Sequence, residues 1–418
     1  MKNIFHSVRG TSDFYPPAAF YFEDLTQKAR KIFKIFGYEP LILPHLEERG
    51  LFKKGIGEAT DVVEKQMFKI EGKDIVLRPE GTAQVVRFYL ERNLYKHRDF
   101  CKFYYVGSMF RGERPQKGRL REFNHIGAEA IGSKNIYLDA EIIELASRII
   151  KEAGIKTYVL RINSLGCSKD KLRLAELIKN KLSSYISMLC DDCKKRISRN
   201  PLRVLDCKKS GCKKIVNSLK IKDDHLCGDC REAFYKLLNL LDDMRVSYLY
   251  DPFLVRGLDY YTNMVFEISS SSLGSQDAIG AGGRYNDLIK RLGGIDMPAV
   301  GFALGLERMM LLLSTTDQLP SADVLVAYTS ASVYNEAYKI LRSLREHKIS
   351  SVIDYREKSL KAQLKLAQKL NIPLVAIVGD EEIKRSRIIV RDMIASLQEE
   401  VELNNLIAFL KERIGKDV

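Results

Sequence analysis

Strand-like segments that lie close together in the sequence constrain the fold of this chain more than any other feature. The segments at 74–79 (DIVLRP) and 100–112 (FCKFYYVGSMFRG) are rich in β-branched and aromatic residues, and a helix is predicted between them at 82–93. Other strands are adjacent in sequence, as on either side of the basic loop in FRGERPQKGRLREF (110–123), where only a loop separates them. Parallel strands need long crossover connections, whereas strands adjacent in sequence favour antiparallel pairing. We therefore predict an α+β domain built on an antiparallel sheet, beginning with residues 1–166.

Two amphipathic helices are predicted within the same region. Residues 21–36 place five apolar side chains on one helical stripe, which Gly37 closes: Leu25, Ala29, Ile32, Phe33 and Phe36. The second helix is predicted to be capped by Asp139 and to run to Gly154.

The composition changes abruptly after residue 166. Residues 167–245 contain 19 Lys or Arg against 11 Asp or Glu, and so supply more than half of the net charge of +14. Six of the eight cysteines lie between residues 190 and 230. Because strand-like sequence resumes at 246–320, we interpret 167–245 as a basic, Cys-rich module inserted into the first domain. Its charge favours a polyanionic partner such as nucleic acid.

A further domain is predicted at 321–418, after Leu319–Pro320. Strands VLVAYT, VIDYR, LVAIVG and IIVRD alternate there with helices near 333–347, 359–370 and 401–413. Such alternation indicates a small α/β domain. With 16 basic and 14 acidic residues it is almost neutral, so binding of nucleic acid there would depend on individually placed groups.

The sequence contains neither a predicted membrane-spanning segment nor a predicted signal peptide, and the expected location of the protein rests on this. No apolar run approaches the roughly 18 residues that a membrane-spanning helix needs, and the start has no long apolar stretch typical of a signal peptide. We therefore expect a cytoplasmic protein with no membrane partner. Its cysteines should stay reduced and available to metal.

Three arginines occupy positions that suit phosphate binding. Arg111 follows a strand and opens a basic loop, Arg256 lies in VRGLDYYT, and Arg308 lies in the apolar segment AVGFALGLERMM. A planar, permanently charged guanidinium can clamp phosphate with two hydrogen bonds. Each arginine alone could instead belong to a solvated loop or helix surface. Together they favour an anion site.

Two glycine-containing segments add to this pattern. The pair Gly282–Gly283 in AGGRYNDL allows close approach of backbone to a ligand, although a glycine pair is more often a turn. In RPEGTA (78–83) a carboxylate and a hydroxyl meet at a predicted helix start, where Thr82 would be the N-cap.

Six segments follow one another along the chain: RGTSDFYPP, LRPEGTA, FRGERPQKGRLREFNHIGAE, LVRGLDYYT, AGGRYNDL and AVGFALGLER. Their sequences and order resemble those of histidyl-tRNA synthetases, and the resemblance covers essentially the whole chain. YEPLILP, with Pro44, resembles the first signature of class II synthetases. The resemblance implies activation of L-histidine with ATP and Mg²⁺, then transfer to the 3′ end of histidine tRNA. It also implies a C-terminal anticodon-binding domain and a homodimer formed around Pro44.

The resemblance also assigns roles at the ATP site. Arg111 matches the arginine at the α-phosphate and Arg308 the one at the γ-phosphate. Phe123 matches the aromatic ring that stacks on adenine, and Glu113 the residue near its amino edge. Arg256 matches an arginine special to this family that also faces the α-phosphate. The three arginines are therefore the candidate catalytic residues.

For the amino acid, the resemblance implies a set of contacts around both ends of histidine. Glu80 and Thr82 match residues that hold the α-amino group, while Glu129 and Tyr261 match those that bracket the imidazole. His125 stands where most bacterial members have Gln, and a neutral imidazole can still accept one hydrogen bond. The complete predicted set is Glu80, Gly81, Thr82, Arg111, His125, Glu129, Arg256, Tyr260, Tyr261 and Tyr285.

For tRNA, Gln116 matches the loop that meets the extra 5′ guanosine of histidine tRNA. The basic module would cover the acceptor arm through Lys208, Lys209, Lys213 and Lys214. Two other functions compete with this one. A catalytically inactive paralogue regulates the phosphoribosyltransferase that opens histidine biosynthesis, but such proteins usually lack the terminal domain. A zinc-containing RNA-binding protein would leave residues 78–129 and 256–308 unexplained.

The basic module also contains a candidate structural zinc site. Cys190, Cys193, Cys227 and Cys230 form two C-x2-C pairs, each able to supply two thiolates from one turn. Cys207 and Cys212, which lie between the pairs, are alternative ligands. The metal would lie far from the reacting phosphates and stabilise a module with few large apolar residues. The cysteines could instead be ordinary core or surface thiols.

Overall fold

The structure is a computed structural model that describes residues 5–58, 60–274, 277–313 and 322–415. The chain forms two compact units, residues 1–313 and 314–418, each described by itself below. The predicted domain boundary after Leu319–Pro320 lies outside the described residues. Within those ranges, no helix has both the length and the apolar character needed to cross a bilayer.

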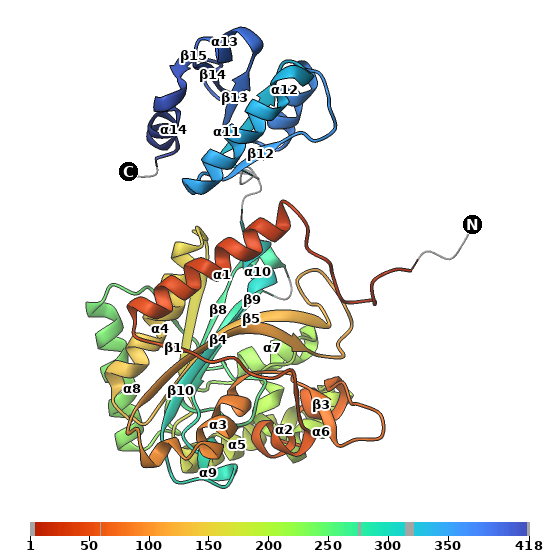
Figure 1. Ribbon diagram of the computed structural model, residues 1–418. Helices are drawn as coiled ribbons and strands as arrows, with labels where there is room; N and C mark the ends of the chain where they lie inside the picture. Colours follow the sequence, from red (N-terminus) through yellow and green to blue (C-terminus); the bar gives the residue numbers. More distant parts are fainter. Residues whose placement is uncertain (1–4, 59, 275–276, 314–321, 416–418) are drawn as a thin grey trace. The chain divides into compact units, whose positions relative to one another are not determined.

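The first unit is built on one eight-stranded sheet (Figure 1). Across the sheet the strands are β1 (Glu39–Pro40), β4 (Cys101–Phe110), β5 (Glu122–Ile131), β10 (Ala299–Gly305), β9 (Ala278–Arg284), β8 (Thr262–Ser269), β6 (Val159–Ser164) and β7 (Leu249–Tyr250). All pairs are antiparallel except β1–β4 and β6–β7 at the two edges. The predicted antiparallel α+β architecture is confirmed.

The longest pairing joins β4 and β5. Its register runs without a break from Cys101 opposite Ile131 to Phe110 opposite Glu122. Residues 111–121, which carry the basic segment, connect the two strands. The loop therefore starts and ends on rigid neighbouring strands, so its first residue, Arg111, has a well-defined backbone position.

Three helices cover one face of this sheet: α1 (Ala18–Ile35), α4 (Ile136–Glu152) and α8 (Gly228–Asp243). Phe33, Ile142 and Leu237 share a core there with Ile126 and Phe302 of the sheet. The predicted first helix is confirmed. Asp139 as a helix cap was wrong. The side chain of Asn135 accepts the N–H of Tyr137 at the helix start, whereas Asp139 is buried one turn inside and pairs with Arg284 at 2.7 Å.

The opposite face carries a second core. It includes α2 (Arg49–Ile56), α3 (Thr82–Glu91), α5 (Ser168–Leu182), α6 (Asp191–Arg199), α7 (Ser210–Ser218) and α9 (Leu288–Arg291). The short strands β2 (Leu46–Glu48) and β3 (Ile75–Leu77) pair beside it. Leu182, Ile197 and Val216 of the basic segment share this core with Val255 and Tyr260. The segment 167–245 is thus helical and packs directly against the sheet-bearing part of the chain.

The second unit is a five-stranded sheet with helices on both faces. Its strands are β12 (Ser351–Ile353), β11 (Val324–Tyr328), β13 (Leu374–Val378), β14 (Arg387–Asp392) and β15 (Gln398–Glu402). Helices α11 (Tyr334–Glu346) and α14 (Leu406–Ile414) cover one face and α12 (Leu360–Lys369) the other, with short α13 (Asp380–Lys384) beside β14. The predicted α/β domain is confirmed. The last predicted helix begins later than expected, because residues 398–402 pair with β14 as an edge strand.

Candidate active site

A cavity of about 680 Å³ lies on the face of the sheet opposite α1, α4 and α8. Successive strand side chains point to opposite faces, and β5 uses this alternation. Ile126 and Ala128 enter the core beneath the helices, whereas Phe123 and His125 line the cavity. The site is therefore placed by the sheet itself.

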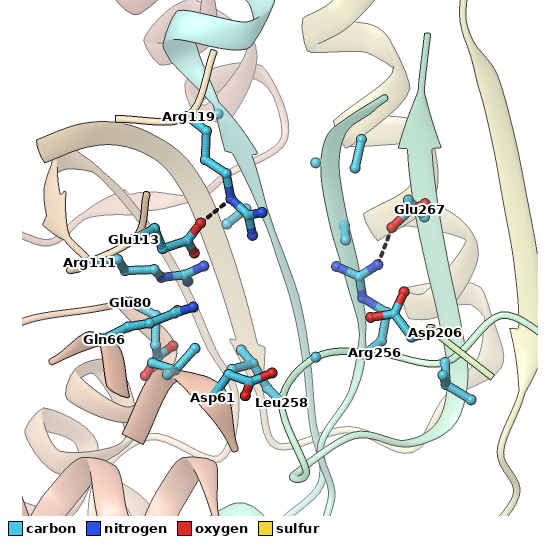
Figure 2. Close-up of a pocket in the computed structure, with 18 of the residues that line it drawn as sticks. Asp61, Gln66, Glu80, Arg111, Glu113, Arg119, Asp206, Arg256, Leu258 and Glu267 are labelled. Atoms are coloured by element: carbon cyan, nitrogen blue, oxygen red, sulfur yellow. Dashed lines mark hydrogen bonds and ion pairs between the residues drawn. The ribbon is translucent and has the colours of Figure 1, made fainter. Parts of the chain in front are cut away.

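All three predicted arginines line this cavity. Figure 2 shows Arg111 and Arg256 extending into it from opposite sides. Nε of Arg111 donates to the carbonyl of Pro79 at 2.9 Å, and the guanidinium lies 5.3 Å from the centre of the Phe123 ring. Arg308, on α10 (Leu306–Met310), donates from Nε to the carbonyl of Gly118 at 3.0 Å. These bonds to backbone fix both guanidinium groups at the cavity.

Burial lowers the pKa of Arg111 and of Arg308, and neighbouring positive charge contributes in both cases. A lowered pKa of a guanidinium means that its charge is poorly solvated. Both groups nevertheless stay protonated, because arginine starts from a very high pKa. An anion bound between them would restore the solvation that burial removes, so the cavity favours an anionic ligand.

Arg256 has a partner that the sequence did not predict. Its Nη1 donates to Glu267 Oε2 at 2.5 Å, as Figure 2 shows. Nε of Arg256 is buried and has no hydrogen-bond partner among the described residues. Glu267 is the lone charge in strand TNMVFEIS, which was the signal available in the sequence. Arg256 therefore has both a fixed orientation and an unused donor.

A second polar cluster surrounds the fully buried Glu129. Its carboxylate accepts from Thr82 Oγ1 at 2.7 Å, from the Tyr285 hydroxyl at 2.6 Å and from the Tyr105 hydroxyl at 3.4 Å. Burial raises the pKa of Glu129 to about 8, although these hydrogen bonds oppose the shift. Thr82 and Tyr105 line the cavity, whereas Glu129 and Tyr285 lie behind them.

Tyr105 was missed by the sequence analysis. A Cβ on Gly81 or on Gly127 would lie within 2.6 Å of its ring, so both glycines make room for it. Tyr260 and Tyr261 also line the cavity, and their ring centres are 4.7 Å apart. The cavity thus combines several tyrosines beside the Glu129 cluster.

The start of α3 is organised by Glu80 and not by Thr82. The Glu80 carboxylate accepts the backbone N–H groups of Thr82 at 2.7 Å and of Ala83 at 2.9 Å. Thr82 as the helix N-cap was therefore wrong, because its hydroxyl donates to Glu129 instead. Gly81 precedes the helix and does not line the cavity.

His125 lies in the cavity wall, with its ring 5.1 Å from that of Phe123. Burial lowers its pKa to about 3, and the positive charges of Arg111, Arg78 and Arg308 contribute. The imidazole is therefore neutral. Its Nδ1 is buried without a hydrogen-bond partner among the described residues, so a ligand can use it.

The loop between β4 and β5 holds its own ion pair. Glu113 is buried and pairs with Arg119, and both line the cavity. Gln116 is exposed further out, where it bridges to Arg119 through the backbone. Glu113, the predicted contact to adenine, is therefore paired with Arg119 of the same loop.

The interpretation that Gly282 and Gly283 let the backbone approach a ligand was wrong. Both lie inside strand β9, opposite Phe302 and Gly301 of β10. A Cβ on Gly282 would lie 2.4 Å from the carbonyl oxygen of Gly301. The glycines therefore allow the central strands to pack closely.

The predicted lysines fall into two pairs. Lys208 and Lys209 line the cavity, and Lys208 pairs with Asp206 at 2.9 Å. Lys213 and Lys214 are exposed on α7 and do not line it.

The predicted zinc ligands do not come together. Cys190 and Cys193 lie with Cys207 and Cys212, whereas Cys227 and Cys230 lie in a separate group with Cys167 and Asp170. The set Cys190, Cys193, Cys227 and Cys230 was therefore wrong as one site. Spacing along the chain shows which cysteines share a turn, but not which turns meet. Cys190 and Cys207 also line the cavity, so their group borders the candidate active site and is not remote from it.

Comparison with known proteins agrees with this geometry. A family model described as histidyl-tRNA synthetase matches residues 10–309, and one described as an anticodon binding domain matches residues 323–413. The chain is 40% identical over 411 residues to the histidine–tRNA ligase of Thermodesulfovibrio yellowstonii, covering 97% of the chain and 98% of that protein. The ligase of Aquifex aeolicus is 42% identical over 403 residues, covering 96% and 99%.

A solved structure shares the fold as well. The apo histidyl-tRNA synthetase of S. aureus superimposes with a TM-score of 0.78 at 29% identity. The match covers 98% of this chain and all of that one.

Proposed function

The chain belongs to the histidyl-tRNA synthetase family, and from that premise we propose which of its residues activate histidine and transfer it to tRNA. As a histidine–tRNA ligase, it converts L-histidine and ATP to histidyl-adenylate and pyrophosphate, then passes histidine to the 3′ end of histidine tRNA. The observation that carries the assignment of residues is one cavity that joins three arginines to the polar cluster around Glu129.

ATP lies along the arginines in this proposal. Arg111 holds the α-phosphate, Arg308 the γ-phosphate, and Phe123 stacks on adenine with Glu113 at its amino edge. Support comes from the 5.3 Å separation of the Arg111 guanidinium and the Phe123 ring, which suits a nucleotide whose base and α-phosphate are close in space. Mg²⁺ enters with ATP, and the carboxylates that line the cavity are the oxygen ligands such an ion prefers.

Histidine lies beside the Glu129 cluster. We assign Glu129 and Tyr261 to the two imidazole nitrogens, with Tyr260 beside them and Tyr285 orienting Glu129. Glu129 is buried with its pKa raised to about 8, so a ligand that brings an N–H group or a positive charge stabilises its ionised form. A ligand without such groups adds no donor or positive charge to the hydrogen bonds from Thr82, Tyr285 and Tyr105, so the ionised carboxyl stays poorly compensated, which gives the selectivity for histidine.

The α-amino group is assigned to the start of α3, where Glu80, Gly81 and Thr82 lie. His125 contributes a weaker acceptor, since its imidazole is neutral and its Nδ1 is unused among the described residues. This arrangement turns the histidine carboxylate toward Arg111 and Arg256.

Adenylate formation is then in-line attack of the histidine carboxylate oxygen on the α-phosphorus, with pyrophosphate leaving on the opposite side. The carboxylate is already ionised, so the step needs no general base. Arg111 and Arg256 neutralise the charge that develops on the α-phosphoryl oxygens, and Arg308 neutralises the leaving pyrophosphate. In the second step a hydroxyl of the terminal tRNA ribose attacks the carbonyl carbon, the bond from that carbon to the phosphate oxygen breaks, and AMP and the hydroxyl proton leave.

The tRNA contacts are proposed on two elements. Gln116, exposed in the loop between β4 and β5, meets the 5′ end of the tRNA. Lys213 and Lys214 on α7 contact acceptor-arm phosphates, while Lys208 and Lys209 lie at the cavity, where the tRNA 3′ end must enter. Residues 321–418 bind the anticodon.

We also propose that the chain forms a homodimer and acts in the cytoplasm. Its domains are proposed to divide at 166/167, 245/246 and 320/321. Next to Pro44, the side chains of Ile42 and Leu46 are 96% and 51% exposed. Apolar side chains exposed together favour a protein contact. The cytoplasm is where tRNA is charged for translation.

Charging of histidine tRNA tests the proposal. The chain, ATP, Mg²⁺ and labelled histidine should yield histidyl-tRNA and one AMP per ester bond. Either competing function, the regulatory paralogue or the RNA-binding protein, predicts no charging.

A further inference from the structure

Four cysteines outside the reaction machinery converge on one point. The sulfur atoms of Cys190, Cys193, Cys207 and Cys212 all lie within 4.8 Å of one another, and those of Cys190 and Cys207 are 3.9 Å apart. Four thiolates at about 2.3 Å from one zinc ion lie about 3.8 Å from each other, as the geometry of a tetrahedron requires. The observed separations, 3.9 Å for one pair and at most 4.8 Å for the others, are compatible with a single four-thiolate ion site.

The local structure supports thiolates at this point. Cys193 is the third residue of α6 and Cys212 the third of α7, and Cys190 immediately precedes α6. The positive ends of both helices therefore lie beside the sulfurs, and the Cys190 N–H donates to Cys212 Sγ at 3.3 Å. Zinc with four thiolates carries a net charge of −2. Residues 190–222 contain eleven Lys or Arg and three Asp, so positive charge is in surplus in the sequence around the four cysteines.

The second group, Cys167, Asp170, Cys227 and Cys230, differs from the first because one of its four members is a carboxylate with other partners. Asp170, its fourth member, pairs with Arg173 at 2.7 Å and accepts the Cys167 N–H at 3.3 Å. Its carboxylate is therefore already occupied at the start of α5. This group serves as a matched control for the first.

We propose that Cys190, Cys193, Cys207 and Cys212 bind one structural zinc ion that holds a wall of the active-site cavity. The segment between Cys193 and Cys207 makes specific contacts with the sheet-bearing part of the chain. Asn200 donates to Asp259 at 3.0 Å, and Arg203 donates to the carbonyl of Gly257, next to Arg256. By fixing both ends of this segment, the ion keeps its contacts with the loop that carries Arg256 in place.

This role rests on the proposed function of Arg256, whereas metal binding itself does not. Metal content is therefore measured first, on the full chain purified without chelator. We expect about one zinc per chain, falling below about a tenth in Cys193→Ser and Cys212→Ser, and staying near one in Cys227→Ser. Less than a tenth of an equivalent in the wild type, iron in place of zinc, or equal loss in Cys227→Ser would overturn the proposal.

A second measurement covers variants that fail to fold. The wild-type chain, stripped of metal and titrated with Co²⁺, should develop the visible absorption of tetrahedral cobalt thiolate, saturating at one equivalent. Absence of that absorption overturns the site. Removal of zinc should also slow histidine-dependent ATP–pyrophosphate exchange about tenfold or more, reversibly on adding zinc. If the chain binds zinc but its exchange rate does not change when zinc is removed, the proposed support of the cavity wall would be wrong, while the four zinc ligands would still be correct.

Discussion

The pair Arg256–Glu267 allows the sharpest test of how the cavity handles phosphate charge. The two side chains are about one-fifth exposed, and their charged atoms are 2.5 Å apart. Arg256→Ala therefore does two things at once. It removes a cation from the α-phosphate, and it leaves a carboxylate unpaired beside the site where phosphates bind.

The two effects can be separated in magnitude. Loss of one group that stabilises developing charge costs about 10²–10³ in rate. If a bound phosphate charge lies about 6 Å from the unpaired carboxylate, Coulomb's law at an effective dielectric constant of about 20 gives about 3 kcal/mol of repulsion. We expect Arg256→Ala to lower the exchange rate about 10⁴-fold or more, and Arg256→Ala with Glu267→Gln to recover at least about tenfold of that loss.

The assay is histidine-dependent ATP–pyrophosphate exchange, with histidine affinity measured in parallel and expected to change little. Arg342→Ala is the control, because Arg342 is an exposed arginine of α11 that pairs with Glu346. Near-normal exchange in Arg256→Ala would refute the role of Arg256. A folded double variant no faster than the single one would refute the repulsion argument.

Three further predictions concern Glu129, His125 and the lysines of α7. Burial raises the folded-state pKa of Glu129 to about 8, so the ligand-free chain should lose stability as pH rises from about 5 to 8, on the order of 4 kcal/mol from this group. Thermal unfolding of Glu129→Gln should therefore show a smaller loss of stability over this pH range, and identical pH profiles of variant and wild type would contradict the prediction. His125→Gln should keep the KM for histidine within about threefold, because a neutral acceptor is retained, whereas His125→Ala should raise it about tenfold; an inactive His125→Gln would show that the imidazole is required. Lys213→Ala with Lys214→Ala should weaken tRNA binding and flatten its log–log salt dependence by about 0.9 per lost duplex phosphate contact, with exchange unchanged; an unchanged slope would make these lysines a solvated face.

The parts of the fold that local pattern determines were predictable. The apolar stripe of α1 and the strand–loop–strand around Arg111 follow from side-chain spacing within a single element, and both are confirmed. Where a neighbour decides the outcome, pattern was insufficient. The helix predicted near 401–413 includes residues 401 and 402, which instead end strand β15 and pair with β14.

The site shows the same division. Arg111, Arg256 and Arg308 could be selected as a set because three such arginines occur together and a charge in an apolar or glycine-rich setting needs a partner. Glu267 and Tyr105 depend on strand register, which the sequence alone does not reveal. The cysteine groups likewise depend on which helix starts pack together.

The central claim is that one cavity couples the three arginines to a pocket selective for histidine. The most direct test is ATP–pyrophosphate exchange by the wild-type chain with each amino acid in turn. We predict exchange with L-histidine at a kcat/KM at least about 10³-fold above that with L-phenylalanine or L-glutamine, because these leave the Glu129 cluster incompletely paired. No exchange with histidine, or comparable exchange with either analogue, would contradict the claim.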